Sequence, residues 1–304
     1  MLDVHRLRLL RDLAHLGTIA AVAHAHAYTP SAVSQQLATL QREAGVALLE
    51  RDGRGVSLTP AGADLVQHAD VVLTALEAAS ASVAAARSGL SGTIRIGAFP
   101  TAVRTVLPEA LVRLARHHPA LDLLVTEVDP AAAPEQLRLR RLDVALLSDY
   151  NLAPDEPENG LDSVALFEET VMLATSVDTP DTDDPVEGAR HAHWIVSSPG
   201  TQCHTAAMRI GRAAGYTPMV RHVADDFTAV LALVAAGQGV ALVPELGAVQ
   251  VPDGVRLLPL PVLRRTRVAY RGGARTHPAV TACVDSLRAV TSALSPSANR
   301  PKGS

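Results

Sequence analysis

The sequence predicts an α/β protein in which an all-α N-terminal domain, a long linker helix and a larger α/β domain follow one another. Three patterns support this order. Apolar residues recur at helical spacing in residues 1–60, an uninterrupted helical pattern covers 61–89, and short apolar strands alternate with helices over 92–295. Residues 296–304 have the composition of a flexible tail.

The composition favours an ordinary globular protein. Hydrophobic residues make up 48% of the 304 residues, and the net charge of −4 shows no overall basic bias toward nucleic acid. Two cysteines are too few for a disulfide scaffold and fit a reducing compartment. The first residues lack the apolar core of a signal peptide, and no stretch approaches the roughly 18 uncharged apolar residues of a membrane span. We therefore expect a cytoplasmic protein with no membrane partner.

The segment "YTPSAVSQQLATLQREAG" has the start and stop signals of a helix. Thr29 suits the N-cap, Pro30 suits the first turn, and Gly45 suits the position after the last turn. A shorter helix capped by Thr18 precedes it, and its alanines allow a neighbouring helix to approach closely. Two short helices joined by a tight turn form a helix-turn-helix, whose second helix enters the DNA major groove.

The outer face of this second helix carries hydroxyls and amides instead of charges. These groups both donate and accept hydrogen bonds, so they can read base edges, and glutamine forms two hydrogen bonds with adenine. We assign base reading to Ser31, Ser34, Gln35 and Gln36. An exposed polar face without any partner is the simpler alternative.

A hairpin is predicted next, in "VALLERDGRGVSLT", where two short apolar strands flank the turn-forming residues 52–55. This wing would hold arginines beside the helix, within reach of DNA phosphates. Residues 1–60 contain six arginines and five acidic residues, a net charge of +1, so the placement of the arginines matters more than their number. The predicted contacts to the DNA backbone are Thr29, Thr39, Arg42, Arg51 and Arg54.

The two helices, the wing and the closing "LTPAG" resemble the N-terminal domain of LysR-type transcriptional regulators. The stretch from "LLRDLAHLGTIAAV" to "LTPAG" follows that family's pattern along its whole length. The resemblance implies a winged helix-turn-helix that binds double-stranded DNA. Many members have glutamine at the second residue of the recognition segment, where this sequence has Pro30, so base contacts from that position are not carried over.

Thr59 and Pro60 start a further helix that reaches Gly89. Its apolar residues are alternately four and three apart, which is typical of a coiled-coil seam. A helix packed on its own domain is the alternative, whereas the family resemblance implies a homodimer or homotetramer that binds an inverted-repeat operator. The predicted dimer seam consists of Leu65, Ala69, Val72, Leu76, Ala79 and Val83.

From residue 92 onward, strands such as "TIRIGAF" and "DVALLSD" alternate with helices, the first expected from Thr101 to His117. This alternation predicts a parallel sheet with helical crossovers. The family resemblance implies an effector domain of two Rossmann-like subdomains that flank a cleft, similar in fold to periplasmic binding proteins. We expect subdomain I to contain residues 92–160 and 264–295, and subdomain II to contain 161–263.

Ligands of such sheets bind where strands end and helices begin, because free N–H groups and the helix dipole favour anions there. We therefore expect a small polar or anionic effector, such as an organic acid or an amino acid. For each serine or threonine, simple helix capping is the alternative. The predicted effector contacts are Phe99, Pro100, Thr101, Ala102, Ser148, Ser197, Ser198, Thr201, Phe227 and Thr228.

Other chemistries find little support in the sequence. His24 and His26 would point apart on a helix, His191 and His193 lack a third ligand, and we expect neither a metal nor another cofactor. No phosphate-binding loop or nucleophile motif is present, so we do not expect an enzyme. The sequence predicts a DNA-binding regulator controlled by a small molecule. The alternative is a small-molecule-binding or redox-sensing module, with Cys203 as sensor, in which DNA binding is vestigial or non-specific.

Overall fold

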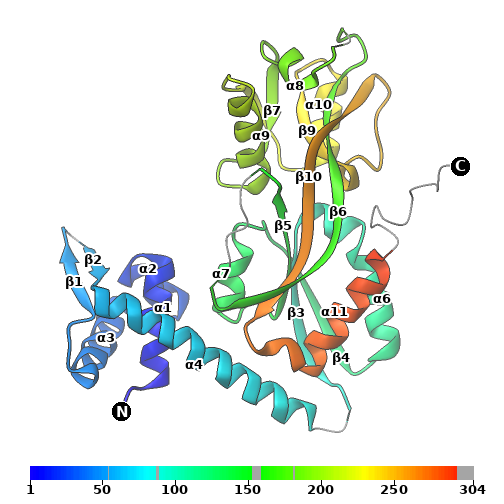
Figure 1. Cartoon of the computed structure of the whole chain (residues 1–304). Coiled ribbons are helices and arrows are strands. Elements are labelled where there is room, and N and C mark those ends of the chain that lie inside the picture. The colour runs from blue at the N-terminus through cyan, green and yellow to red at the C-terminus, as the bar shows by residue number, and fades with distance from the viewer. Residues whose placement is uncertain (54, 87–88, 153–158, 181, 293–304) are drawn as a thin grey trace, which may run out of the picture.

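The N-terminal domain consists of three helices and a hairpin (Figure 1). The computed structural model describes residues 1–53, 55–86, 89–152, 159–180 and 182–292. Arg54 and the tail over 296–304 therefore lie outside the described residues. The elements are α1 (Val4–Leu16), α2 (Ile19–Ala25), α3 (Pro30–Ala44), β1 (Leu49–Asp52) and β2 (Gly55–Leu58).

Side-chain caps fix where these helices begin. The Thr18 and Thr29 hydroxyls accept hydrogen bonds from the amides of Ala21 and Ala32, at 3.1 and 3.2 Å, as the sequence predicts. Gly17 and Gly45 end α1 and α3 with φ angles of +75° and +72°, in the left-handed region that favours glycine. The predicted bounds of α3 are thus confirmed.

A buried carboxylate joins α1 to the turn after α2. Asp12 is 2% exposed and accepts hydrogen bonds from Arg11 Nε and Nη2, at 2.9 and 2.6 Å. Its second oxygen lies 2.8 Å from His26 Nε2. Burial alone would raise the pKa of Asp12, but the hydrogen bond with His26 and the charge of Arg11 lower it below the ordinary value. Asp12 is therefore a charged anchor for the helix-turn-helix.

The linker helix α4 (Pro60–Ala85) contacts both the N-terminal domain and the effector domain. Its first half packs on the N-terminal domain, where Ala69 is fully buried and Leu65 is half-buried in the core around Leu10 and Leu37. The predicted seam is therefore wrong at Ala69, which faces the chain's own core. Its members Val72, Leu76, Ala79 and Val83 remain exposed.

The larger domain is built on a six-stranded sheet with strand order β4-β3-β5-β10-β6-β9. The strands are β3 (Gly92–Ala98), β4 (Leu121–Glu127), β5 (Val144–Tyr150), β6 (Leu161–Ser176), β9 (Ala241–Pro244) and β10 (Val255–Arg271). β3, β4 and β5 are parallel, but β10 runs antiparallel to both β5 and β6. The predicted parallel sheet is therefore wrong for half of the strands. The long strands β6 and β10 and the edge strand β9 run antiparallel to their neighbours.

A second, two-stranded sheet lies in the upper subdomain of Figure 1, formed by β7 (His193–Val196) and β8 (Met219–Val223). The helices of this subdomain are α8 (Pro185–Gly188), α9 (Gln202–Ala213) and α10 (Phe227–Ala235), with the short η1 (Glu245–Gly247). α9 and α10 cover separate cores, one around Trp194 and one around Leu231. This half of the domain therefore has its own hydrophobic interior.

The lower subdomain is likewise covered on both faces of its sheet. The helices α6 (Leu107–His117) and α11 (Pro278–Thr291) pack over Ile96, while α7 (Ala133–Arg138) packs over Ala145. The two remaining elements are α5 (Pro100–Arg104) and η2 (Ala274–Thr276). The single helix expected from Thr101 to His117 is wrong, since it divides into α5 and α6.

β6 and β10 each run through both subdomains. Phe167 on β6 lies in the lower core, whereas Val171 on the same strand lies in the upper core. On β10 the change occurs between Val262 and Val268. The crossing on β6 therefore lies inside the strand, a few residues after the predicted boundary at 161.

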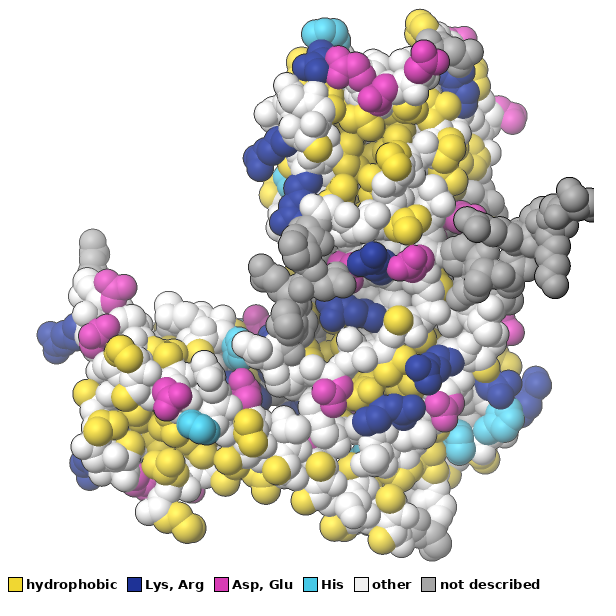
Figure 2. Space-filling model, viewed as in Figure 1, with side chains coloured by type: hydrophobic (Ala, Val, Ile, Leu, Met, Phe, Trp, Pro, Cys, Tyr) yellow, Lys and Arg dark blue, Asp and Glu magenta, His cyan; other side chains and the backbone are white. Residues whose placement is uncertain are grey.

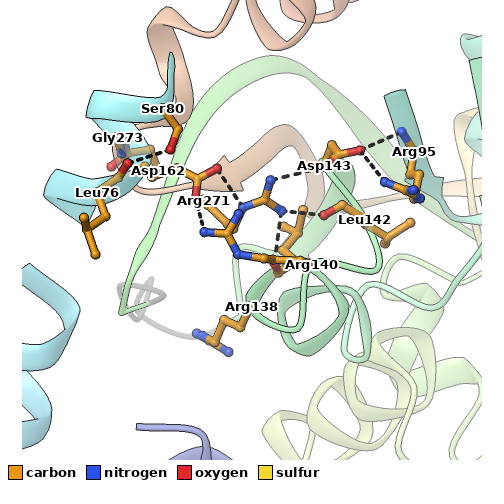
Figure 3. A network of polar contacts seen from close by, with 12 residues as sticks. Leu76, Ser80, Arg95, Arg138, Arg140, Leu142, Asp143, Asp162, Arg271 and Gly273 are labelled. Atoms are coloured by element: carbon orange, nitrogen blue, oxygen red, sulfur yellow. Dashed lines mark hydrogen bonds and ion pairs between the residues drawn. The ribbon is translucent and has the colours of Figure 1, made fainter. Parts of the chain in front are cut away.

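The second half of α4 is held on the lower subdomain by a polar network (Figure 3). Glu77, which is 8% exposed, accepts hydrogen bonds from Arg140 Nη2 at 2.6 Å and Arg271 Nε at 3.1 Å. Arg271 also donates to Asp143 Oδ1 at 3.1 Å and to the Leu142 carbonyl oxygen at 2.7 Å. The linker helix is thereby fixed to the effector domain of its own chain.

We expect Asp12→Asn to destabilise the protein at neutral pH by removing the charge that holds Arg11 and His26. The pKa of Asp12 is lowered in the folded state, so its contribution is complete above the unfolded value of about 4 and is lost as pH falls through the folded value. Urea unfolding of the parent and the variant should show a difference in the free energy of unfolding that becomes smaller below about pH 4. The control Asp64→Asn changes a carboxylate that is 72% exposed, and an equal difference there would contradict the assignment.

We expect Glu77→Gln to lower the free energy of unfolding by about 2 kcal/mol, because a buried carboxylate with two guanidinium partners loses its charge. Urea titration would measure the loss, and Glu109→Gln on the exposed side of α6 should change it by less than about 0.5 kcal/mol. Equal stability of the Glu77 variant and the parent would mean that this network does not hold α4.

Candidate functional site

The exposed face of α3 carries three of the four predicted base-reading residues. Ser31, Ser34 and Gln35 are all exposed, while Val33, Leu37 and Leu40 on the opposite side are buried. The Thr29 cap lies 3.0 Å from the Ser31 hydroxyl, which fixes the start of this face. One side of α3 therefore packs in the core, and the other side exposes hydroxyl and amide groups to solvent.

Gln36 does not belong to this face. It is half-buried, and its amide oxygen accepts a hydrogen bond of 2.9 Å from Arg6 Nε on α1. Arg6 also pairs with Glu43 near the other end of α3. The assignment of base reading to Gln36 is therefore corrected to a structural role, the bracing of α3 on α1.

The wing is tied directly to α3. Gln41 Oε1 accepts hydrogen bonds from the amides of Leu48 and Leu49, at 3.0 and 3.1 Å, which seats β1 beside the helix. A groove between α3 and the wing is lined by Ser34, Ala38 and Arg51, among others. A predicted base contact and a predicted phosphate contact thus share one groove. The sequence analysis missed Gln41, although a glutamine among apolar residues near the helix end was a usable signal.

Two further predicted backbone contacts, Thr39 and Arg42, lie in the second half of the same helix. Thr39 donates to the Gln35 carbonyl oxygen at 2.9 Å and accepts from Arg42 Nη2 at 2.7 Å. Arg42 and Arg51 are exposed. The structure therefore places two described arginines at the edges of the helix-turn-helix face.

A cleft of about 220 Å³ lies between the two subdomains. Seven of the ten predicted effector contacts line it: Phe99, Pro100, Thr101, Ser148, Ser197, Thr201 and Phe227. They meet because the ends of β3, β5, β7 and β8 converge on this space. The fold therefore brings together predicted residues that are up to 128 positions apart, as between Phe99 and Phe227.

Three predicted contacts do not line the cleft. Ala102 is fully buried in the lower core. The Ser198 hydroxyl and amide both bond to Asp225, each at 2.7 Å, and the Thr228 hydroxyl accepts from Arg104 Nη1 at 2.8 Å. The Ser198–Asp225 and Arg104–Thr228 hydrogen bonds thus connect segments at the rim of the cleft.

A buried ion pair forms the floor of the cleft, and the sequence analysis missed it. Arg264 is 2% exposed and donates to Glu169 Oε1 through Nε at 2.8 Å, while Nη2 lies 2.7 Å from the same oxygen. Nη2 also donates to the Thr101 hydroxyl at 3.0 Å. Burial opposes the charge on Arg264, but Glu169 holds its pKa above the ordinary value. The sequence did contain a signal for this residue. Arg264 lies on the same face of its strand as the apolar Val262 and Val268, which indicates that its side chain is buried.

Cys203 lines the cleft, with its Sγ atom 3.0 Å from Tyr150 Oη. Burial raises the pKa of the Cys203 thiol, although the nearby Arg264 charge opposes this. Burial also raises the pKa of Cys283, to about 12, and this second cysteine lies in the core of the lower subdomain. The two cysteines therefore occupy separate interiors as protonated thiols.

A larger pocket of about 420 Å³ lies entirely within the upper subdomain, between β6, α8 and the end of α10. Its described lining contains Leu173, Val240 and Leu258 but no acidic residue, lysine or arginine. Figure 2 shows hydrophobic side chains gathered on the drawn face of this subdomain. A ligand bound there would contact one subdomain only, unlike a ligand in the cleft.

Two family models match the chain. The model described as "Bacterial regulatory helix-turn-helix protein, lysR family" matches residues 4–63, and the "LysR substrate binding domain" matches residues 87–292. The chain belongs to the LysR family of transcriptional regulators. This LysR-type regulator accordingly combines a DNA-binding domain with an effector-binding domain.

Individual relatives agree with this assignment. The chain is 28% identical to the transcriptional dual regulator GltC of Bacillus subtilis, over 80% of this chain and 81% of GltC. It is 31% identical to a probable hydrogen peroxide-inducible genes activator of Streptomyces viridosporus, over 86% of this chain and 89% of that protein. Both relatives are described as regulators of genes, not as enzymes.

Solved structures share the fold of the LysR-type regulator. A mutant of OxyR from Corynebacterium glutamicum matches with a TM-score of 0.57 and 24% identity, over 99% of this chain and 96% of that one. Full-length BenM matches with a TM-score of 0.54 and 22% identity, over 96% and 98%. In the part of the chain that the structure describes, no helix combines the length and apolar character needed to cross a bilayer.

We expect Cys203 to react slowly with iodoacetamide at neutral pH, because burial keeps its pKa above the ordinary value of 9.0 and the thiolate is scarce. In a Cys283→Ser background, the rate should rise about tenfold per pH unit up to at least pH 9. Free cysteine serves as the reference thiol. Rapid alkylation that is already independent of pH near neutrality would contradict the protonated state.

Proposed function

We propose that this LysR-type regulator binds an inverted-repeat operator as a homodimer or homotetramer, and that a small polar effector in the cleft controls this binding. The observation that carries the proposal is the groove between α3 and the wing, where the exposed Ser34 of α3 and the exposed Arg51 of β1 line the same space. Ser31, Ser34 and Gln35 would read base edges, while Thr29, Thr39, Arg42, Arg51 and Arg54 would contact the backbone.

A similar protein whose structure was solved in complex with DNA supports this mode of binding. CbnR in complex with its target DNA matches this chain with a TM-score of 0.50 and 25% identity, over 95% of this chain and 100% of CbnR. Because operator DNA lies in the cytoplasm, we place the regulator there, and we propose no catalytic activity for it.

Exposed apolar residues support assembly with a second copy. Figure 2 shows hydrophobic side chains along α4, where Val72, Leu76 and Val83 are 39%, 41% and 64% exposed. They lie on a side of the helix away from Glu77, which faces the chain's own effector domain. Such a stripe, together with Ala79 and the half-buried Leu65, is suited to pairing with the same helix of a partner. Two-fold pairing would match an inverted-repeat operator.

The alternative of a redox sensor finds less support than a reversible effector site. The Cys203 thiol is held protonated beside Tyr150, and Cys283 lies in another core. The cleft, by contrast, collects residues from both subdomains around open space. A ligand that contacts both subdomains can favour one of their relative arrangements, and only this difference in affinity can alter DNA binding.

We expect Gln35→Ala and Arg51→Ala to separate base reading from phosphate binding. Gln35→Ala should lower affinity for the operator by about 1–3 kcal/mol with little effect on random DNA, because it removes a base contact. Arg51→Ala should weaken binding to both DNAs and reduce the salt slope by about one. Fluorescence anisotropy with duplexes from the region upstream of the gene, across a salt series, would measure both effects.

The matched control is Arg113→Ala, which removes an exposed arginine of α6 in the effector domain and should leave both affinities unchanged. Equal losses on operator and random DNA for Gln35→Ala would rule out its base-reading role. Equal, salt-sensitive binding of the parent protein to both DNAs would contradict specific operator recognition itself.

A further inference from the structure

The lining of the cleft is acidic. Glu127 and Asp129 contribute carboxylates from the lower subdomain, and Asp225 contributes one from the upper subdomain. Arg264 is the one basic side chain in the described lining, and its charge is already balanced by Glu169 at 2.7 Å. The cleft therefore presents a surplus of negative charge to a ligand.

These three carboxylates have no ion-pair partner among the residues that the structure describes. Asp129 Oδ1 accepts a hydrogen bond from the Ala131 amide at 2.8 Å, and Asp225 accepts from the amide and hydroxyl of Ser198, all uncharged donors. Partial burial and the negative charge of Asp225 raise the pKa of Asp129 above its ordinary value. Asp129 and Asp225 thus repel each other from opposite subdomains.

Two of the three helix N-termini at the cleft are already capped by the chain's own side chains, whereas α5 has no side-chain cap at Phe99. Asp226 Oδ1 accepts from the amides of Thr228 and Ala229 at the start of α10, at 2.8 and 3.1 Å. The Thr201 hydroxyl caps α9 by accepting from the His204 amide at 3.2 Å. An anionic effector at α9 or α10 would have to displace a cap, and at any of the three helices it would share the cleft with three carboxylates. Of the expected effector classes, the structure thus favours a polar ligand over an anion.

An unpartnered hydroxyl points independently to a ligand. Ser148 lines the cleft and is only 6% exposed, yet its side chain has no hydrogen-bond partner among the described residues. Thr266, directly opposite Ser148 on the neighbouring strand, is 1% exposed, and its hydroxyl also lacks a partner. The Ser148 hydroxyl faces the cleft and is not used by another described residue, so it is available to hydrogen-bond to a bound molecule.

We infer that the effector carries a protonated amine, which binds between Asp129 and Asp225 while another polar atom of the ligand bonds to Ser148. This inference rests on the proposed function and specifies the effector class of the same cleft. A volume of about 220 Å³ is small beside sites for drug-sized ligands, roughly 300–1,000 Å³, and fits a short amine or an amino acid. An ammonium group would replace the repulsion between the subdomains with attraction to both.

Calorimetry on the full chain with four matched probes tests this inference. Putrescine, butylamine, butanediol and succinate share a four-carbon skeleton and differ in the charge of their ends. We expect the two amines to bind with affinities that fall as salt is added, and we expect neither butanediol nor succinate to bind. Asp129→Asn should weaken amine binding about tenfold or more, and Ser148→Ala should weaken putrescine binding severalfold.

The control variant is Asp122→Asn, an exposed carboxylate at the other end of β4 from Glu127, which should bind the amines as the parent does. Thermal melting of each variant verifies that it is folded. Succinate binding that Asp129→Asn strengthens would overturn the inference and leave an effector cleft for anions. No heat with either amine at about 10 mM would also overturn it.

Operator binding by the parent protein is measured separately, without any probe. Loss of specific DNA binding there would contradict the proposed function whatever the calorimetry shows. Specific DNA binding without amine binding would contradict only the effector class.

Discussion

The pairing of β6 with β10 is the constraint on which the two-subdomain architecture depends. The two strands run side by side from Leu161 opposite Arg271 to Ser176 opposite Val255, and each contributes to the core of both subdomains. Their register is interrupted between Pro259 and Leu263 and again between Thr266 and Arg267. Any change in the angle between the subdomains must be absorbed here, because the same two strands are the frame of both halves. The cleft lies beside this region, since Arg264 of β10 is part of its lining.

The electrostatics of the cleft follow from this crossing. Arg264 and Glu169 come from the two crossing strands, and their pairing places one buried cation and one buried anion at the floor. Breaking such a pair would leave an uncompensated charge in an apolar setting, so the pair holds Thr101 and the start of α5 in a fixed place. The rim has the opposite character. The three carboxylates that line the cleft are more exposed and come from the end of β4, the loop after it and the loop before α10. The hydrogen-bond donors to Asp129 and Asp225 are neutral, whereas Asp226 beside them pairs with Arg104 at 3.3 Å. The ion pair at the floor carries no net charge, whereas the carboxylates that line the cleft above it are negative. A positively charged ligand can therefore neutralise them.

Local signals in the sequence predicted local structure well. Thr29, Pro30 and Gly45 defined α3 because capping chemistry acts over three or four residues, and the ends of the strands identified most of the cleft because topology places them together. The long-range features were not predictable in the same way. Glu169 and Arg264 are 95 positions apart and lie in mid-strand, where no turn or cap marks them. The seam on α4 was only partly right, since apolar spacing alone does not tell which side faces the chain's own core, as Ala69 does. The break between α5 and α6 had a signal in Pro108, because proline is favoured in the first turn of a helix and disfavoured in its interior.

The linker helix has a mechanical consequence. α4 contains 26 residues, about 39 Å at 1.5 Å per residue, and each of its halves is held by a different domain. Ala69 packs into the DNA-binding domain, and Glu77 is clamped by Arg140 and Arg271 on the effector domain. An element fixed in this way behaves as a stiff lever arm. If the lower subdomain tilts by a few degrees, α4 would tilt with it and displace the recognition helix sideways. The size of this displacement would depend on the length of α4, because the helix itself transmits the motion.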